Sequence, residues 1–235
     1  MEEKTLKTSW KQRIIILVIA VLLLGSVVLT YMLVVLNGSS SSSDTNSDAE
    51  IAELTEEYQK KSEELEAASK PLSDKYFDEF SKYKSEVKAY NSANANAAGL
   101  ETKDLKVGTG KTLEEGNMDY SAYYIGWCAD GSIFDSSFND NENPTSLKTP
   151  LDASVGLIEG WNQGVVGMKL GGVRQLTISG ALAYGDTQEI CGGTNSPLKF
   201  IIYAFETDPK LKSLNDELDD IYMRLYYAYS GGSSL

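Results

Sequence analysis

The stretch that most constrains the fold is Leu198-Lys199-Phe200-Ile201-Ile202-Tyr203-Ala204-Phe205. Successive side chains of a β-strand point to opposite faces of a sheet, so even-numbered residues share one face and odd-numbered residues the other. The even-numbered face is entirely apolar and suits a protein core. The odd-numbered face carries Ile201, Tyr203 and Phe205, which are too apolar for open solvent. We therefore expect a final strand whose second face receives one of the helices that flank the sheet in the sequence.

Upstream of this strand the sequence shows strand and turn signals rather than helical periodicity. Residues 118–126 are rich in Tyr and Ile, which is typical of a strand, and Asp130-Gly131 is a hairpin signal. Residues 171–178 predict a turn followed by a strand, and residues 160–168 leave room for one short helix. The pattern predicts an α+β domain of about one hundred residues, with an antiparallel sheet and a single short helix.

A helical pattern precedes the sheet in residues 49–90, which contain one Pro and no Gly. The best apolar stripe, at spacings of three and four residues, consists of Leu72, Tyr76, Phe80, Tyr83 and Val87. Pro71 either starts a second helix or kinks one long helix. The stripe is a dimer seam, a client-binding arm or a face packed on the domain itself. Because aromatic residues dominate it and no heptad is sustained, we favour packing on the domain.

Residues 208–229 predict a second amphipathic helix, which Asp208-Pro209 can start. Its apolar residues recur every three or four positions: Leu211, Leu214, Leu218, Ile221, Leu225 and Tyr229. This face needs a partner, and the helix in residues 49–90 is the candidate because both helices flank the same domain. Between that helix and the sheet, residues 91–100 are rich in Asn, Ala and Gly and predict a linker.

The N-terminal region predicts a membrane anchor. Residues 14–36 contain no charge, and a helix of that length spans roughly 30 Å, the thickness of a bilayer core. A cleaved signal peptide is the alternative, but the run is longer than such a signal requires and no A-x-A pattern ends it. By the positive-inside rule, the basic residues 1–13 form a cytoplasmic tail and the acidic body lies outside the cell membrane. The Ser-rich residues 37–48 predict a flexible linker.

Composition limits the kinds of function open to the chain. The formal net charge of −13 argues against nucleic acid or an anionic membrane surface as the main partner. The sequence has no His, which removes the commonest general base and the commonest metal ligand. Its two Cys disfavour a structural zinc site. We therefore expect neither a metal nor a cofactor.

A series of short motifs carries more information than periodicity does. In chain order they are Val107-x-x-Gly110, Tyr124-x-Gly126, Asp130-Gly131-x-x-Phe134-Asp135-Ser136-Ser137, Leu157-Ile158-x-Gly160-Trp161, Gly164-x-x-Gly167-Met168, Gly171, Arg174, Ala183-Tyr184-Gly185 and Leu198-x-Phe200. Their order and spacing resemble the FKBP family of peptidyl-prolyl cis-trans isomerases. The resemblance covers residues 105–206, and we expect the isomerase domain to occupy residues 101–207.

The resemblance implies a curved five-stranded antiparallel sheet wrapped on a short helix, with the active-site pocket between them. The positions that match the family's catalytic pocket are Tyr124, Phe134, Asp135, Ile158, Trp161, Tyr184 and Phe200, and Leu157 matches a substrate-binding position. The aromatic residues among them also suit an ordinary core. Asp135 is harder to explain in that way, because a carboxylate in apolar surroundings is costly unless it is hydrogen-bonded.

Such a pocket suits rotation about an X-Pro bond, which faces a barrier of roughly 18–20 kcal/mol although the two isomers are close in free energy. No bond breaks, so no nucleophile or proton shuttle is required, and the lack of His is no objection. An apolar pocket favours the twisted amide, which is less polar than the planar one. The resemblance implies that the Tyr184 hydroxyl and the Ile158 backbone N–H hold substrate carbonyls and that Asp135 orients the pocket electrostatically.

The sequence departs from the family directly after Ala183-Tyr184-Gly185. An Ile-Pro-Pro-like stretch usually follows, whereas residues 186–197 are polar, with Ile190 as a candidate substrate contact. The family's Phe before the Ile-Glu-Gly-Trp motif has no clear match either, and Leu147 and Leu151 are the candidates to replace it. These departures affect the expected rate and sequence preference more than the fold.

The two cysteines lie at informative positions. Cys128 follows the strand in residues 118–126, and Cys191 lies in the variant loop. They are either a disulfide that ties the loop to the sheet or two separate thiols. A location outside the membrane favours the disulfide.

The sequence thus predicts an enzyme, an extracytoplasmic peptidyl-prolyl isomerase that assists the folding of secreted or surface proteins. Its expected partners are proline-containing polypeptides and the membrane, with no nucleic acid and a possible homodimer through the helical segments. The altered loop favours the alternative, a non-catalytic proline-peptide-binding or chaperone module on the same fold. A structural membrane scaffold is a third class, which the aromatic stripes permit but do not require.

Overall fold

The computed structural model describes residues 45–116, 118–153 and 157–230. The chain divides into two compact units, Met1–Ala52 and Glu53–Leu235. In the first unit the described part is the opening of one helix, so the fold reported below is that of the second unit.

The predicted cytoplasmic tail (1–13) and membrane anchor (14–36) lie outside the described residues, and so does most of the predicted linker (37–48). Within the part of the chain that the structure describes, no helix combines the length and the apolar character that a membrane span requires.

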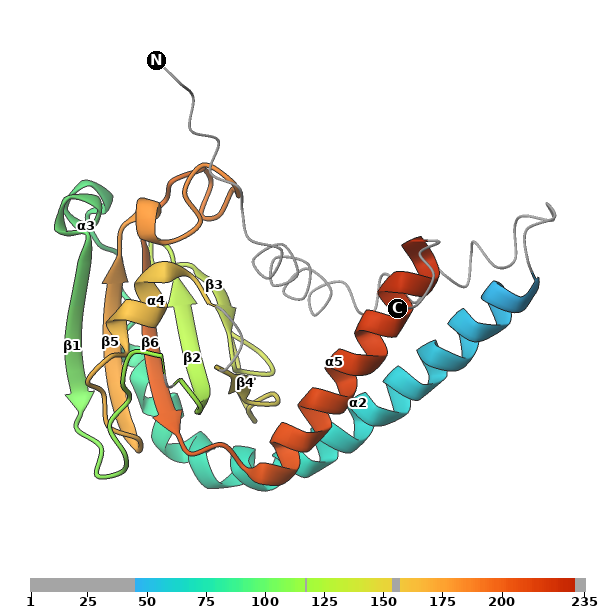
Figure 1. Cartoon of the computed structure of the whole chain (residues 1–235). Helices are drawn as coiled ribbons and strands as arrows, with labels where there is room; N and C mark the ends of the chain where they lie inside the picture. Colours follow the sequence, from blue (N-terminus) through green and yellow to red (C-terminus); the bar gives the residue numbers. More distant parts are fainter. Residues whose placement is uncertain (1–44, 117, 154–156, 231–235) are drawn as a thin grey trace, which may run out of the picture. The chain divides into compact units, whose positions relative to one another are not determined.

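The centre of the second unit is an antiparallel sheet (Figure 1). Its strands are β1 (Leu100–Lys106), β2 (Ser121–Trp127), β3 (Ile133–Ser136), β4 (Leu151–Asp152), β5 (Gly172–Ile178) and β6 (Leu198–Phe205). The strand order is β1-β5-β6-β2-β3, and the two-residue β4 pairs with β2 beside this path. The expected α+β fold with an antiparallel sheet is confirmed, and β4 adds a short sixth strand to the five that the resemblance implies.

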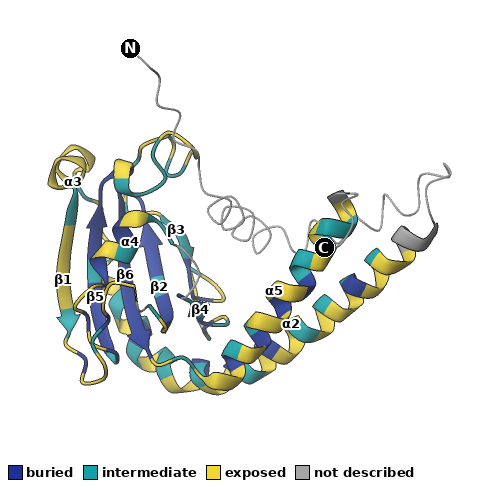
Figure 2. Cartoon of the chain, viewed as in Figure 1, coloured by how far each residue is buried: buried dark blue, intermediate teal, exposed yellow. Residues whose placement is uncertain are grey.

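Strand β6 lies in the middle of the sheet, where Ile201 pairs with Ile125 of β2 and with Gln175 of β5. Every residue of β6 except Lys199 is buried. The even-numbered residues belong to one hydrophobic core, and the odd-numbered residues from Ile201 onward belong to a second core on the opposite face. Figure 2 shows the central strands buried along their length. The alternation read from the sequence therefore predicts both faces correctly.

The short helix α4 (Glu159–Gly164) packs on the even-numbered face (Figure 1). Gly160 allows this close approach, because a Cβ at that position would collide with the side chain of Ile178 in β5. Glu159 lies in the first turn, where a carboxylate interacts favourably with the helix dipole. The helix that the sequence predicts in residues 160–168 is thus present but shorter.

The C-terminal half of helix α2 (Thr45–Phe80) covers the odd-numbered face. Phe80 is fully buried there, and the Tyr76 ring stacks on Phe205 with centroids 4.7 Å apart and meets Tyr203 edge-on at 5.1 Å. Because burying this stripe removes its apolar area from water, the packing stabilises the helix and the sheet together. The prediction that the aromatic stripe packs on its own domain is confirmed.

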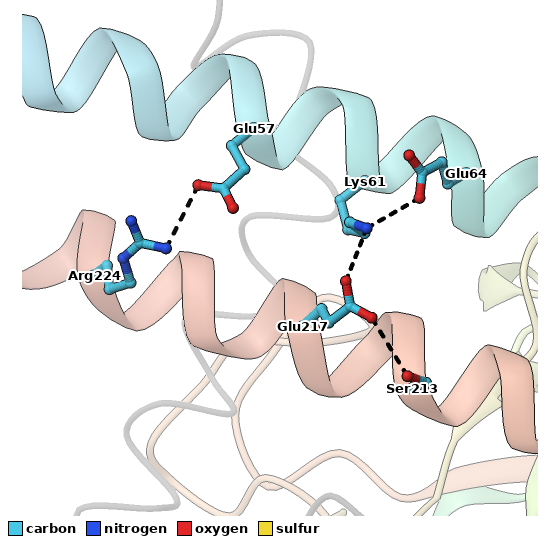
Figure 3. Close-up of polar contacts among 6 residues, drawn as sticks. All are labelled: Glu57, Lys61, Glu64, Ser213, Glu217 and Arg224. Carbon is cyan, nitrogen blue, oxygen red and sulfur yellow. Dashed lines mark hydrogen bonds and ion pairs between the residues drawn. The ribbon is translucent and has the colours of Figure 1, made fainter.

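The part of α2 around Leu65 and before it pairs with helix α5 (Pro209–Ser230). Leu65 of α2 packs with three leucines of α5, Leu211, Leu214 and Leu218. Two ion pairs also join the helices, at positions that precede Leu65 on α2 (Figure 3). Lys61 Nζ lies 2.8 Å from Glu217, and Arg224 lies 3.5 Å from Glu57. Because the residue numbers of the paired positions fall along α2 as they rise along α5, the two helices are antiparallel. The expected pairing of the flanking helices is confirmed.

Two details of the helical segments differ from the sequence-based expectation. Helix α2 begins at Thr45, inside the predicted linker. It continues through Pro71 as one long helix, which is one of the two alternatives that the sequence left open. Packing against the domain supports it there: Ser69 and Ser73 are buried, and the Ser73 hydroxyl accepts a hydrogen bond from the Leu147 N–H at 2.8 Å.

The second difference concerns residues 91–100, which were expected to be a linker and instead contain helix α3 (Ser92–Ala98) and the first residue of β1. The Asn91 side chain caps α3 by accepting from the Asn94 N–H at 2.9 Å. The Asn96 side chain accepts from the Gly180 N–H at 2.8 Å and ties α3 to the sheet domain. Asn content predicted a loop here, but these side chains act as a cap and as a tether.

Candidate active site

The predicted site residues come from separate elements and meet on the even-numbered face of the sheet. Trp161 of α4 and Phe200 of β6 form a buried base, 3% and 4% exposed. The partly exposed side chains packed against this core include Tyr124, Phe134, Leu157, Ile158, Tyr184 and Ile190. The structure therefore brings together all the apolar residues that the resemblance assigns to the site.

The aromatic rings of the site meet edge to face. The centroid distances are 5.1 Å for Trp161–Phe200, 5.6 Å for Tyr124–Trp161 and 5.7 Å for Phe134–Phe200, with interplanar angles of 70°, 79° and 87°. This is a favoured arrangement for aromatic quadrupoles. Gly126 of β2 makes it possible, because a Cβ there would lie 2.8 Å from the rings of both Phe134 and Phe200.

Asp135 of β3 is held by the tyrosine of the neighbouring strand. The Tyr124 hydroxyl donates to Asp135 Oδ2 at 2.5 Å. A hydrogen bond to an ionised carboxylate is among the stronger ones in proteins, and it offsets the cost of placing Asp135 beside apolar groups. The bond explains why a carboxylate follows Phe134 in the sequence.

Both tyrosine hydroxyls of the site remain protonated at neutral pH. Burial, followed by the charge of Asp135, raises the pKa of Tyr124 well above its ordinary value. The same two causes, in the same order, raise the pKa of Tyr184. Each hydroxyl is therefore a hydrogen-bond donor throughout the physiological range.

The two serines after Asp135 fix the position of β3 against β2. The Ser137 hydroxyl accepts from the Tyr124 N–H at 2.9 Å, and the Ser137 N–H donates to the Tyr124 carbonyl at 2.9 Å. The Ser136 hydroxyl accepts from the Phe138 N–H at 3.0 Å. The Phe134-Asp135-Ser136-Ser137 motif thus places a ring, a carboxylate and the backbone that orients them.

Arg174 of β5 fixes the end of α4, a role that the sequence analysis missed. Its buried guanidinium donates to the carbonyls of Gly164 and Val166 at 2.9 and 3.0 Å and forms a two-point ion pair with Asp104 of β1. A cation at a helix C-terminus satisfies carbonyls that the helix leaves unpaired. The position of Arg174 in the motif series was the available signal, but its partners depend on tertiary contacts.

The variant loop is tied to the sheet as the sequence suggested. Cys128 and Cys191 form a disulfide with Cα atoms 5.4 Å apart. The Asn195 N–H also donates to the Gly185 carbonyl at 2.6 Å. Ile190 and Cys191 consequently pack against the core on the site's face.

Of the two leucines considered as replacements for the family's Phe, the structure separates Leu147 from the site. Leu147 packs in the core on the odd-numbered face, with Phe80 and Phe138. Leu151 of β4 packs against the core that contains Trp161. Leu147 is therefore a wrong candidate, because its side chain belongs to the core on the opposite face of the sheet.

The fold and the site define a peptidyl-prolyl isomerase of the FKBP type, and comparisons with known proteins place the chain in that family. The family profile described as FKBP-type peptidyl-prolyl cis-trans isomerase matches residues 110–204. An FK506-binding protein of Neisseria meningitidis serogroup B is 35% identical over 111 residues, which cover 46% of this chain and 93% of the relative. The chain belongs to the FKBP family and is a peptidyl-prolyl cis-trans isomerase.

Other relatives show the same partial coverage. An FK506-binding protein of Streptomyces anulatus is 38% identical over 46% of this chain and 82% of its own length. FK506-binding protein 4 of Dictyostelium discoideum is 41% identical over 37% of this chain and only 22% of its own length. The solved structure of AtFKBP13 is 30% identical over 48% of this chain and 96% of that chain, with a TM-score of 0.38. Helices α2 and α5 lie outside the matched residues 110–204.

Proposed function

We propose that the aromatic site on the even-numbered face binds the prolyl residue of a substrate polypeptide and lowers the barrier to rotation of the preceding peptide bond. The arrangement of partly exposed apolar side chains around the buried Trp161–Phe200 pair carries this proposal. A proline ring offers an apolar surface without an N–H, which matches a surface built of ring faces and edges.

The proposed chemistry is desolvation of the rotating amide. As the bond twists, resonance between nitrogen and carbonyl is lost and the amide becomes less polar. Phe134, Trp161 and Phe200 surround it with apolar groups, which favour the twisted form over the planar one. No covalent step is involved.

Polar groups at the edge of the site would hold the substrate on each side of the rotating bond. The Tyr184 hydroxyl is a donor at neutral pH because its pKa is raised, and we assign it to one substrate carbonyl. The backbone N–H of Ile158, the residue that precedes α4, is assigned to a second carbonyl. Asp135 is assigned to orienting the site through the Tyr124 hydroxyl. Leu157 and Ile190 would contact the substrate beside the proline.

A protease-coupled assay on a chromogenic tetrapeptide with one X-Pro bond tests these assignments. Trp161→Ala should reduce kcat/KM by at least about tenfold, because the largest apolar surface of the site is lost. An undiminished rate for this variant would remove Trp161 from the site. A rate of wild-type protein no higher than the uncatalysed rate would favour the non-catalytic binding module.

For the place of action, we propose that residues 14–36 anchor the enzyme in the cell membrane and that the isomerase domain acts outside it on secreted or surface proteins. The uncharged run, the basic residues before it and the acidic body after it support this orientation. The full chain should resist alkaline extraction from membranes, and deletion of residues 14–36 should release it. Release of the full chain by alkali would contradict the anchor.

We propose no homodimer through the helical segments, although the sequence made one possible. The aromatic stripe of α2 packs on β6, and the leucines of α5 pack on Leu65 within the same chain. Both apolar faces that suggested a dimer therefore have partners in one molecule.

A further inference from the structure

Trp161 is held at its one polar atom by a residue that the family resemblance does not assign to the site. Its indole Nε1–H donates to the hydroxyl oxygen of Tyr120 at 2.9 Å. Indole has one donor and no acceptor, and a buried donor needs a partner. Tyr120 supplies that partner from the segment directly before β2.

Tyr120 is itself rigidly placed. Its side chain is 1% exposed in the same core as Trp161, and its backbone carbonyl accepts from the Ala153 N–H at 3.0 Å. Burial raises the pKa of Tyr120 well above its ordinary value, although the bond from Trp161 acts in the opposite direction. Its hydroxyl therefore stays neutral and available as an acceptor at physiological pH.

We propose that Tyr120 is a positioning residue that fixes the indole plane of Trp161 beneath a bound prolyl ring. The inference rests on the function proposed above. The Tyr124 and Phe200 rings confine the indole through edge contacts at 5.6 and 5.1 Å. The bond to Tyr120 adds a directional contact, which fixes the orientation of the indole within this packing.

The bond also determines which part of the indole a substrate meets. With its N–H engaged by Tyr120, Trp161 offers ring surface and no donor to the rotating amide. A free indole N–H would hydrogen-bond the planar, more polar amide and stabilise the ground state. Occupying this donor keeps the surface apolar and preorganised for the twisted form.

The test is Tyr120→Phe in the full-length protein, with Tyr123→Phe as the matched control. Tyr123 is the next tyrosine in the chain but belongs to the core on the odd-numbered face, and its buried hydroxyl has no hydrogen-bond partner among the described residues. Two measurements are made on each protein: kcat and KM for a proline tetrapeptide, and the indole N–H resonances by NMR. Trp127 is an internal reference, because its Nε1–H donates to the Lys88 carbonyl at 3.1 Å on the other face.

In Tyr120→Phe we expect the Trp161 indole proton to move upfield and exchange faster, while the Trp127 proton stays unchanged. We expect kcat/KM to fall roughly fivefold, the factor that corresponds to one hydrogen bond of ordinary strength, with most of the loss in kcat. Tyr123→Phe should leave both indole protons and the rate unchanged. Replacing Trp161 by Phe as well should abolish the effect of Tyr120→Phe on the rate.

Two results would overturn the proposal. An indole proton that moves without any loss of rate would show that the bond serves the core alone. A Trp161 proton that does not respond to Tyr120→Phe would show that the bond is absent. If Tyr120→Phe does not fold, the test is made on wild-type protein with a proline peptide bound. Rapid exchange of its Trp161 indole proton with solvent would contradict the hydrogen bond to Tyr120.

Failure of the proposed function gives a different pattern. In that case wild-type protein would show no turnover of the peptide and no response of the Trp161 resonance to it. The comparison of Tyr120→Phe with wild type would still report the hydrogen bond through the Trp161 proton.

Discussion

The pair formed by Tyr124 and Asp135 links the stability of the site to its chemistry. A half-buried carboxylate next to Phe134 would be costly, and the 2.5 Å bond from Tyr124 offsets that cost. The same bond directs the tyrosine hydroxyl away from other acceptors. Asp135 therefore places a negative charge and removes a competing donor at the edge of the site.

Asp135→Ala should reduce kcat/KM by about tenfold while the protein stays folded, because the variant frees the Tyr124 hydroxyl and removes the charge. The proline tetrapeptide assay measures the rate, and circular dichroism checks the fold. Asp186→Ala is the control, since Asp186 is exposed just beyond Tyr184. Equal rates for the two variants would show that Asp135 is a structural residue only.

The raised pKa values of Tyr124 and Tyr184 predict how the enzyme responds to alkali. Because both hydroxyls stay protonated through the ordinary tyrosine pKa of about 10, kcat/KM should not fall between pH 7 and that value. A group whose pKa is higher in the folded state stabilises the fold below its unfolded pKa and loses that effect as pH rises above it. The free energy of unfolding should therefore decrease above about pH 10. A loss of activity centred below pH 9, measured by NMR exchange without a coupling protease, would contradict this assignment.

Helix α2 is a component of the sheet domain rather than a separate stalk. Its last turns bury Phe80 and stack Tyr76 on Phe205 of β6. The Glu79 carboxylate adds two contacts, accepting from Lys106 at 2.5 Å and from the Tyr203 hydroxyl at 3.2 Å. The helix thus supplies part of the core on the odd-numbered face of the sheet.

Phe80→Ala should reduce the free energy of unfolding of the isomerase domain by about 3–5 kcal/mol, because it leaves a cavity in the core between α2 and the sheet. Chemical denaturation followed by circular dichroism measures the change. Tyr226→Ala is the control: Tyr226 is 42% exposed near the end of α5, so its loss should cost less than about 0.5 kcal/mol. A similar small cost for both variants would mean that the domain does not depend on α2.

The disulfide joins the loop that follows Tyr184 to the end of the β2 strand region. Replacing both Cys128 and Cys191 by Ser should lower the free energy of unfolding by about 2–4 kcal/mol, since the bridge closes a segment of 63 residues. It should also raise KM for proline peptides, because Ile190 is no longer held against the site. Wild-type protein treated with reductant should behave like the double variant. Unchanged stability and unchanged KM in both samples would show that the loop is held by its other contacts.

The whole molecule combines an isomerase domain with a pair of helices that lie outside the residues matched by the family profile. The family profile ends at residue 204, and α5 begins at Pro209. The buried leucines of α5 pack on Leu65 of α2, outside the aromatic site. The helix pair therefore has its own apolar contacts and its own ion pairs (Figure 3).

Truncation after Asp208 should leave kcat/KM within about twofold of the wild-type value, since the buried leucines of α5 belong to a different core from the described site residues and separate regions contribute nearly independently. The same truncation should increase hydrogen exchange in the part of α2 around Leu65, which loses its cover. Exchange measured by mass spectrometry separates this part from the last turns before Phe80, which should stay protected by the sheet. A large loss of activity would show that the helix pair supports the site.

Much of the fold and site could be predicted from the sequence, because the informative signals were local or ordered along the chain. The alternation in β6 depends only on the geometry of an extended strand, so both of its faces could be predicted. The order of the motifs located Tyr124, Phe134, Trp161, Tyr184 and Phe200, which the structure brings to one core. The choice among partners for the aromatic stripe followed from its composition.

Other features were decided only by the tertiary structure. Tyr120 and Trp161 are 41 residues apart, and their bond depends on how α4 lies against the segment before β2. Arg174 meets the end of α4, Asn96 fixes α3 to the sheet, and Leu147 lies on the face opposite Leu151. Sequence spacing does not encode these contacts, because each depends on the path of two distant segments at once. The sequence by itself determined the family, the strand faces and the residues of the candidate site, because these signals are local or ordered along the chain, and the packing of distant segments decided which groups surround those residues.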